Sequence, residues 1–101
     1  MYDKFLPIGT VCLLKEAEKE IMIIGYIPKE KKDDYKIYDY MACLYPEGIL
    51  NNENALVFNH NQISEIRYLG YNDIEYEKFN VEMKNLVDNL IYMGNKNDNK
   101  E

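Results

Sequence analysis

The sequence predicts an α+β fold: a small, strongly curved five-stranded antiparallel sheet or SH3-like barrel, followed by one C-terminal amphipathic helix. Five short apolar segments rich in β-branched and aromatic residues alternate with polar, turn-forming stretches, as expected for strands. A glycine interrupts the second segment, and such glycines are typical of the bends that curved sheets need. Apolar residues near the C-terminus recur with the helical period. The 101 residues suffice for one domain with one core.

The first two strands are predicted on either side of a charged hairpin loop. Residues 10–15 (TVCLLK) form a short apolar run, and residues 16–20 (EAEKE) suit the loop. Residues 21–27 (IMIIGYI) are the strongest strand candidate, because they are mostly β-branched or aromatic. Both faces of this segment are apolar, so we expect a central strand that is covered on each side. Gly25 predicts a bulge or bend within it.

Three further strands are predicted in the middle of the chain. A charged loop over residues 28–35 leads to a third strand over residues 36–45, which a Pro-Glu-Gly turn ends. Residues 55–58 (ALVF) and 65–71 (EIRYLGY) form the fourth and fifth strands. Residues 59–63 between them suit a single helical turn, because asparagine caps such turns well.

The last predicted element is a helix over about residues 73–93. An Asn-Asp pair can cap its start, and Gly94 predicts its end. Residues 1–93 would then form a single β-rich domain with its C-terminal helix, and the polar residues 94–101 a disordered tail. The apolar stripe of the helix consists of Phe79, Met83, Leu86, Val87, Leu90 and Ile91.

Charge and composition exclude several classes of function. A net charge of −6, from 18 acidic and 12 basic residues, disfavours nucleic-acid binding, which requires a basic surface; an SH3-like domain that binds RNA or DNA is the weakest alternative. The apolar run 21–27 is too short to span a bilayer, and no signal-like segment precedes it. We therefore expect a cytoplasmic protein without membrane insertion. The sequence contains no His/Cys cluster, so we expect neither a metal nor another cofactor.

Two cysteines and one histidine are the candidates for catalysis. A cysteine-dependent hydrolase or thiol enzyme would pair Cys43 with His60 and a third group that orients the histidine. Cys12 and Cys43 both lie in predicted strands between apolar neighbours, a setting typical of buried and unreactive thiols. The sequence thus favours a protein that is not an enzyme, with the Cys43–His60 enzyme as the alternative.

Tyrosine is the outlier of the composition, with ten residues and no tryptophan. Tyrosine is enriched at protein interfaces because it combines a large apolar ring with a polar tip. Tyrosines that share a face of the third strand would leave an aromatic patch near the surface; alternatively, the C-terminal helix covers that face. The candidate protein-binding residues are Tyr38, Tyr40, Tyr45, Tyr68 and Tyr71.

Asp39 is the charged exception on the other, apolar face of the third strand, where Cys43 also lies. A buried carboxylate without partners is costly. We therefore expect Asp39 to lie at an open end of the sheet, or to accept hydrogen bonds from turn donors. The candidate donors are Asn59, His60 and Asn61.

Three segments together carry a family resemblance: FLPIGTVCLLKEAEKEIMIIGY, YDYMACLYPEGIL and LVFNHNQISEIRYLGY. They resemble domain-of-unknown-function family 4176, which consists of small Firmicutes proteins, over roughly residues 5–93. Such proteins are typically encoded beside type VII secretion genes, near LXG toxins and WXG-like helical partners. The resemblance implies an accessory, adaptor or chaperone-like protein that binds the toxin or its helical partner, without a catalytic residue. A homodimer remains open, because the C-terminal helix could pair with a second copy.

The resemblance also includes polar and turn residues whose placement fits a structural or docking role. These residues are Asp39, Pro46, Gly48, Asn59 and His60.

Overall fold

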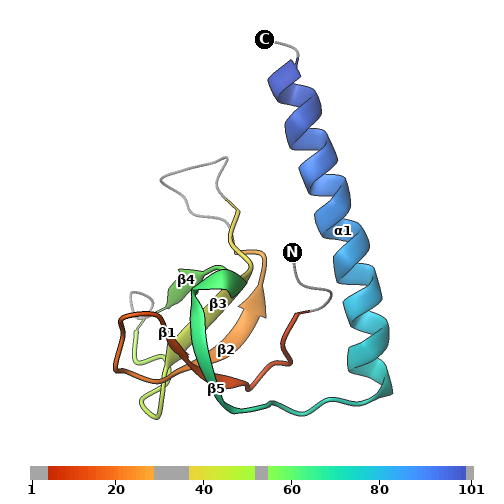
Figure 1. Cartoon of the computed structure of the whole chain (residues 1–101). Helices are drawn as coiled ribbons and strands as arrows, with labels where there is room; N and C mark the ends of the chain where they lie inside the picture. The colour runs from red at the N-terminus through yellow and green to blue at the C-terminus, as the bar shows by residue number, and fades with distance from the viewer. Residues whose placement is uncertain (1–4, 29–36, 52–54, 100–101) are drawn as a thin grey trace. The chain divides into compact units, whose positions relative to one another are not determined.

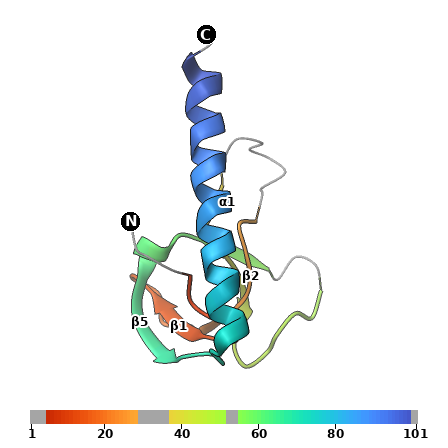
Figure 2. The ribbon, with the colours of Figure 1, turned by 90° about the vertical axis from the view of Figure 1, so that its right-hand side faces the viewer.

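The computed structural model of the chain describes residues 5–28, 37–51 and 55–99 (Figures 1 and 2). Its contacts divide the chain into two compact units, which are described separately: Leu6–Tyr71 contains the sheet, and Phe5 belongs with the segment that begins at Asn72. The five antiparallel strands and the single C-terminal α-helix confirm the predicted α+β class. The single domain over residues 1–93 stays a prediction.

The sheet has the strand order β4-β3-β2-β1-β5 (Figure 1). Each of the two edge strands, β4 and β5, pairs with one neighbour, so the sheet does not close on itself. The predicted five-stranded sheet is thus confirmed, in an open and mildly curled form rather than as a closed barrel. The strands are β1 (Val11–Leu14), β2 (Ile21–Tyr26), β3 (Tyr40–Leu44), β4 (Leu56–Phe58) and β5 (Ile63–Tyr68), with a 3-10 turn, η2 (His60–Gln62), before β5.

Strand β2 occupies the interior of the sheet, as its apolar character predicts, because it pairs with β1 on one side and β3 on the other. Ile21 and Ile23 point into the core and are buried, whereas Met22 and Ile24 on the opposite face are half-buried. The register with β3 shifts between Ile23 and Gly25, which confirms the predicted bulge.

The core lies on the face of the sheet that carries Ile23 and Tyr40. Tyr40 of β3 is in register with Phe58 of β4, and the two rings stack with centroids 5.2 Å apart. Both side chains are inaccessible to solvent. The other fully or almost fully buried side chains of this unit include Pro7, Thr10, Cys12, Ala42 and Cys43.

The strand β3 ends in a turn at the Pro-Glu-Gly sequence, as predicted. The Tyr45–Pro46 peptide bond is cis, and Gly48 has a φ of 74°, in the left-handed region that favours glycine. The N–H of Gly48 donates a hydrogen bond of 2.8 Å to the carbonyl of Leu44 and closes the turn. The strand before it is shorter than predicted over residues 36–45.

In the second unit, helix α1 spans Ile74–Asn99. The side chain of Asp73 accepts a hydrogen bond of 3.0 Å from the N–H of Tyr76, which confirms the predicted cap. The predicted end at Gly94 is wrong: the helix continues through it, since a single glycine costs only about 1 kcal/mol within a helix. The predicted tail 94–101 is helical as far as Asn99, and residues 100–101 lie outside the described part of the chain.

Phe5 is tied to the first turns of α1 by its backbone. Its N–H donates a hydrogen bond of 2.7 Å to Oδ1 of Asn80, and its carbonyl accepts one from the hydroxyl of Tyr76. Asn80 and Met83 are buried, whereas Phe79 and Leu86 of the predicted apolar stripe are 41% and 47% exposed. The side chains of Leu90 and Ile91 lie outside the described residues.

Candidate functional site

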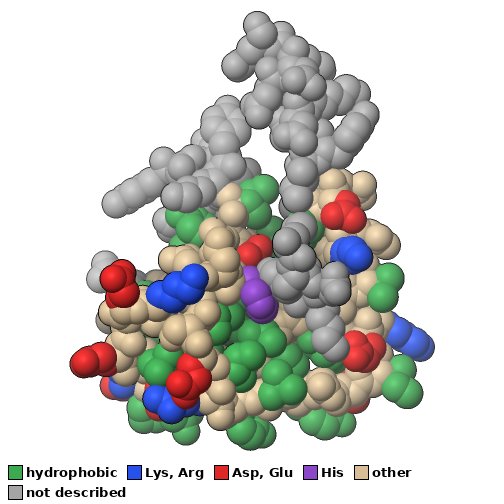
Figure 3. All heavy atoms as spheres, in the orientation of Figure 1, with side chains coloured by type: hydrophobic (Ala, Val, Ile, Leu, Met, Phe, Trp, Pro, Cys, Tyr) green, Lys and Arg blue, Asp and Glu red, His purple; other side chains and the backbone are tan. Residues whose placement is uncertain are grey.

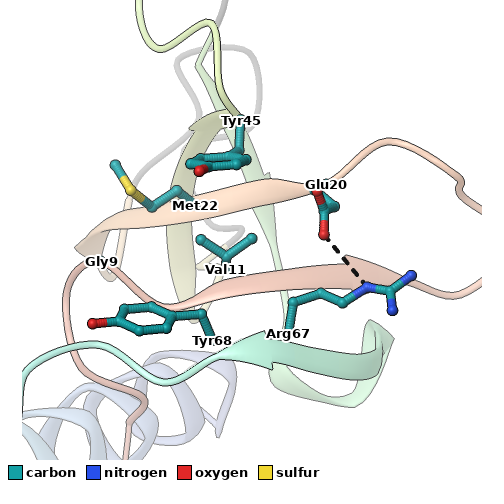
Figure 4. A pocket seen from close by; sticks show the side chains of 7 residues that line it. All are labelled: Gly9, Val11, Glu20, Met22, Tyr45, Arg67 and Tyr68. Atoms are coloured by element: carbon teal, nitrogen blue, oxygen red, sulfur yellow. Dashed lines mark ion pairs between the residues drawn. The ribbon is translucent and has the colours of Figure 1, made fainter.

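A mainly apolar groove of about 410 Å³ lies on the face of the sheet opposite Ile23 and Tyr40 (Figure 4). Its centre follows the strand register, which places Val11 of β1 beside Met22 of β2 on one side and beside Tyr68 of β5 on the other. Three strands therefore contribute to one continuous surface. The residues that line the groove are Gly9, Val11, Glu20, Met22, Tyr45, Arg67 and Tyr68.

Accessibility changes from the floor of the groove to its walls. Val11 is 7% exposed and forms the floor, whereas Tyr45 and Tyr68 are 43% and 65% exposed and stand on either side of it (Figure 4). Burial of apolar surface stabilises a complex by roughly 25 cal/mol per Å², and an aromatic ring offers a large area at little cost in conformational entropy. The groove is thus suited to receive apolar side chains.

The rim of the groove at the β5 edge is charged. Nε of Arg67 lies 3.4 Å from a carboxylate oxygen of Glu20, and Nη1 of Arg67 lies 2.6 Å from one of Glu65 (Figure 4). All three side chains are solvent-accessible, so these ion pairs contribute little to folding. They do hold the guanidinium beside the apolar floor, where it can donate hydrogen bonds to carbonyl or carboxylate groups.

The structure separates the five candidate tyrosines. Tyr45 and Tyr68 line the groove, Tyr71 is 80% exposed directly after β5, and Tyr38 is half-buried. The prediction that Tyr40 belongs to a surface patch is wrong, because its ring is fully buried. Alternation along a strand shows which residues share a face, but not which of the two faces the rest of the chain covers.

A polar cluster joins the start of β3 to the η2 turn. The N–H of His60 donates a hydrogen bond of 2.8 Å to the carboxylate of Asp39, and the N–H of Asp39 donates one of 3.1 Å to Oδ1 of Asn59. This confirms that Asp39 accepts a hydrogen bond from a turn donor. The cluster links residues on two strand connections and holds the turn in place.

The hydroxyl of Tyr40 extends this cluster inward. It accepts a hydrogen bond of 3.0 Å from the N–H of Leu6 and lies 2.8 Å from Nδ1 of His60, to which it can donate its proton. A neutral imidazole with its proton on Nε2 fits this arrangement. Burial lowers the pKa of His60 below 6.5, while the nearby Asp39 charge acts in the opposite direction. His60 is the only histidine, and Figure 3 shows its ring at the surface of the sheet unit.

Both thiols of the chain are buried. Cys12 is fully buried and Cys43 is 2% exposed, and both are free. Burial raises the pKa of Cys12 to about 11, so this thiol stays protonated at neutral pH. The enzyme that would use Cys43 and His60 stays a prediction, tested by the thiol titration below.

The described residues form neither a metal-binding cluster nor a membrane-spanning helix. Within residues 5–28, 37–51 and 55–99, no three His, Cys, Asp or Glu side chains are grouped so that they could hold a metal ion. In the same part of the chain, the helix is not apolar enough over a sufficient length to cross a membrane.

Sequence comparison places the chain in a family. The family model described as Domain of unknown function (DUF4176) matches residues 5–79. The chain belongs to this family. In this DUF4176 protein the match covers all five strands and the first turns of α1. No curated protein and no solved structure matches the chain significantly.

Reasoning from the sequence identified the tyrosine walls of the groove but missed its floor and its charged rim. In the sequence, Val11 and Met22 look like any other apolar strand residues. Glu20 and Arg67 look like isolated surface charges. The one available signal was the second apolar face of the segment 21–27, which showed that some surface must cover Met22.

Proposed function

We propose that this DUF4176 protein is a non-enzymatic binding protein that receives the apolar face of a partner helix in the groove. One observation carries the proposal: an apolar floor with two exposed tyrosine walls lies open on a sheet whose other face is packed. Grooves of this kind recognise amphipathic helices through a few apolar anchors spaced one turn apart.

The charged rim supports a helix as the occupant. Arg67 can donate hydrogen bonds to the carbonyls that remain unpaired at the end of a helix, and its positive charge is favourable at a helix C-terminus. Glu20 and Glu65 hold the guanidinium there. We therefore expect the partner helix to place its apolar stripe over Val11 and its C-terminal end towards Arg67.

The partner follows from the family resemblance. Proteins similar to this chain are typically encoded beside type VII secretion genes, together with LXG toxins and WXG-like helical proteins. Our proposal is that this chain acts in the cytoplasm as an accessory, adaptor or chaperone-like protein for an LXG-type toxin or its WXG-like partner. Covering an apolar helix face before secretion would keep that partner from aggregating.

Co-purification tests this function. The chain is co-expressed with the N-terminal region of the toxin encoded beside it, and separately with the neighbouring helical protein, and each mixture is analysed by size-exclusion chromatography. We expect co-migration with one of them. Replacing Tyr45 or Tyr68 by alanine should weaken binding at least about tenfold, because aromatic anchors at a groove carry much of the binding energy.

Tyr71→Ala is the matched control. Tyr71 is 80% exposed and does not line the groove, so the same loss of a tyrosine ring should leave binding unchanged. Circular dichroism establishes that each variant is folded. If neither locus partner co-migrates, or if Tyr45→Ala binds as well as Tyr71→Ala, the proposal is wrong.

A further inference from the structure

The structure points to a second interface, at the open edge of the sheet. We propose that two copies of this chain pair through their β5 strands, antiparallel and with twofold symmetry, with Ile66 on the symmetry axis. This dimer goes beyond the proposed function, because it uses the edge of β5 rather than the floor and tyrosine walls of the groove.

Strand β5 presents an edge that can accept another strand. Among the residues that the structure describes, it pairs with β1 alone and forms one edge of the sheet. All residues from Ser64 to Tyr68 are exposed. Such an unpaired edge is a template for strand addition unless the sequence protects it.

The side chains on this edge are unusually apolar for a surface strand. Ile66 is 46% exposed and Tyr68 is 65% exposed, and Leu69 directly after the strand is 47% exposed. Proline and lysine, which commonly protect edge strands, are absent from Ile63–Tyr68, although its pairing with β1 has register shifts at Arg67 and Ser64. The charges on the strand are Glu65 and Arg67, and their order makes the strand complementary to itself.

The register follows from these two charges. In an antiparallel pair centred on Ile66, Glu65 lies opposite Arg67 of the second copy, and Arg67 lies opposite Glu65 of that copy. Opposite charges in directly facing positions stabilise a strand pair, whereas like charges destabilise it. A centre on Glu65 or on Arg67 would bring like charges together, and a shift by one residue would leave both charges facing uncharged side chains. Only the centre on Ile66 places opposite charges face to face in an isologous interface, beside the ion pair that Glu65 and Arg67 form within each chain.

Pairing in this register would also join the two grooves. The twofold axis that relates two antiparallel edge strands is perpendicular to the sheet, so it places the same face of both copies on one side. The Tyr68 residues of both copies then lie on one face, which is that of the groove. The dimer would therefore offer two helix-binding grooves on a single extended sheet.

Cysteine cross-linking tests the register directly. The native thiols are buried, so a cysteine introduced on β5 is the accessible one. Facing residues in a strand pair have Cα atoms about 4.5–5.5 Å apart, within the range for a disulfide. Ile66→Cys should form a covalent dimer under mild oxidation, seen on a non-reducing gel.

Ser64→Cys is the matched control for the cross-link. In the proposed register the two copies of this residue lie roughly 13 Å apart along the strands, too far for a disulfide, because a strand rises about 3.3 Å per residue. The parent chain shows the background from Cys12 and Cys43.

Charge exchange tests the same contact in solution. Sedimentation velocity over a concentration series should show a monomer–dimer equilibrium for the full chain. Arg67→Glu should weaken the dimer at least about tenfold, because it puts acidic groups opposite each other. The exchange Glu65→Arg with Arg67→Glu recreates both pairs and should restore the dimer.

Three results would overturn the dimer: a monomer at every concentration up to about 1 mM, cross-linking of Ser64→Cys as fast as Ile66→Cys, or an unchanged dimer in Arg67→Glu. An experiment that rejects the dimer can be distinguished from one that rejects helix binding in the groove. Tyr45→Ala should weaken partner binding at least about tenfold without changing the dimer, since Tyr45 follows β3 and is not part of the β5 strand.

Discussion

Asp39 contributes to the fold through a turn that is distant in the sequence. Its carboxylate accepts the backbone N–H of His60, and its own N–H donates to the Asn59 side chain. The two contacts join the start of β3 to the turn before β5, so this carboxylate holds two connections of the sheet together.

Removal of this carboxylate should weaken the fold. We expect Asp39→Ala to lower the free energy of unfolding by about 1–3 kcal/mol, because a hydrogen bond to a charged group is lost and the His60 N–H is left without this acceptor. Urea denaturation followed by circular dichroism measures the change. Asp39→Asn keeps an acceptor oxygen and should lose less; a parent-like midpoint for Asp39→Ala would reject this role.

His60 should make stability depend on pH. Its pKa is lowered in the folded protein by burial, so the folded state binds the proton less readily than the unfolded chain, whose pKa is about 6.5. The stabilisation is complete above this value and falls as the pH drops through it towards the lower folded pKa. His60 is hydrogen-bonded to Asp39 and to the Tyr40 hydroxyl, and the Asp39 charge opposes the shift of its pKa.

The measurement is the free energy of unfolding between about pH 7.5 and about pH 5, where histidine titrates. Other groups also titrate over this range, so the parent is compared with His60→Gln, which cannot ionise at this position. The parent should lose more stability on acidification than the variant. Parallel curves for the two proteins would exclude His60 as the source.

The two cysteines should be inert in the folded protein. Cys12 has a raised pKa of about 11 and Cys43 is 2% exposed, so neither presents an accessible thiolate. A native titration with an aromatic disulfide reagent should show negligible reaction, and denaturation should expose both thiols. Rapid reaction of Cys43 in the native protein, lost in Cys43→Ser, would instead support the thiol-enzyme alternative.

At the level of elements, the chain entering β1 packs tightly against the chain leaving β5. The N–H of Gly70 donates a hydrogen bond of 3.0 Å to the hydroxyl of the buried Thr10. A Cβ atom at Gly70 would lie 2.3 Å from the carbonyl oxygen of Ile8 and 2.9 Å from the nitrogen of Thr10. These are backbone atoms, which cannot move aside as a flexible side chain can.

Gly70→Ala should therefore destabilise the sheet unit by about 1–3 kcal/mol, the usual cost of overpacking. Gly25→Ala is the matched control, because its Cβ would meet Cβ of Met41 at 3.6 Å, an ordinary contact. Thermal unfolding of both variants measures the difference. Equal melting temperatures would show that the two backbone segments can separate without cost.

Helix α1 shows that a glycine, a common signal for a helix end, does not always end a helix. Gly94 resembles a helix end in the sequence, but the helix continues to Asn99 because glycine only weakens a helix that its neighbours can continue. The start of the helix was predictable, since the Asp73 cap acts through a contact within one turn. Helix starts with a capping side chain are thus easier to predict than helix ends without one.

At the scale of the whole molecule, the two proposed interfaces use different parts of one sheet. The groove lies on a face formed by β1, β2 and β5, and the dimer contact lies along the outer edge of β5. A net charge of −6 on each copy opposes close approach at low salt. The facing Glu65 and Arg67 residues supply local attraction at the place where two copies would meet.

The sequence by itself determined the number, type and order of the elements. Apolar period, β-branched content and turn residues are local properties, so five strands, the bulge at Gly25 and a C-terminal helix were all predictable. Even the contact between Asp39 and the η2 turn could be inferred, because a buried carboxylate requires a donor.

Only the tertiary structure decided which face of each strand is covered. Strand alternation is equally consistent with either face in the core, and this is why Tyr40 was predicted at the surface but lies buried against Phe58. The groove depends on the same choice, since strand register brings Val11, Met22 and Tyr68 together from distant parts of the chain. Strand register and the choice of the covered face arise from contacts between strands, so they cannot be predicted from local patterns in a single sequence.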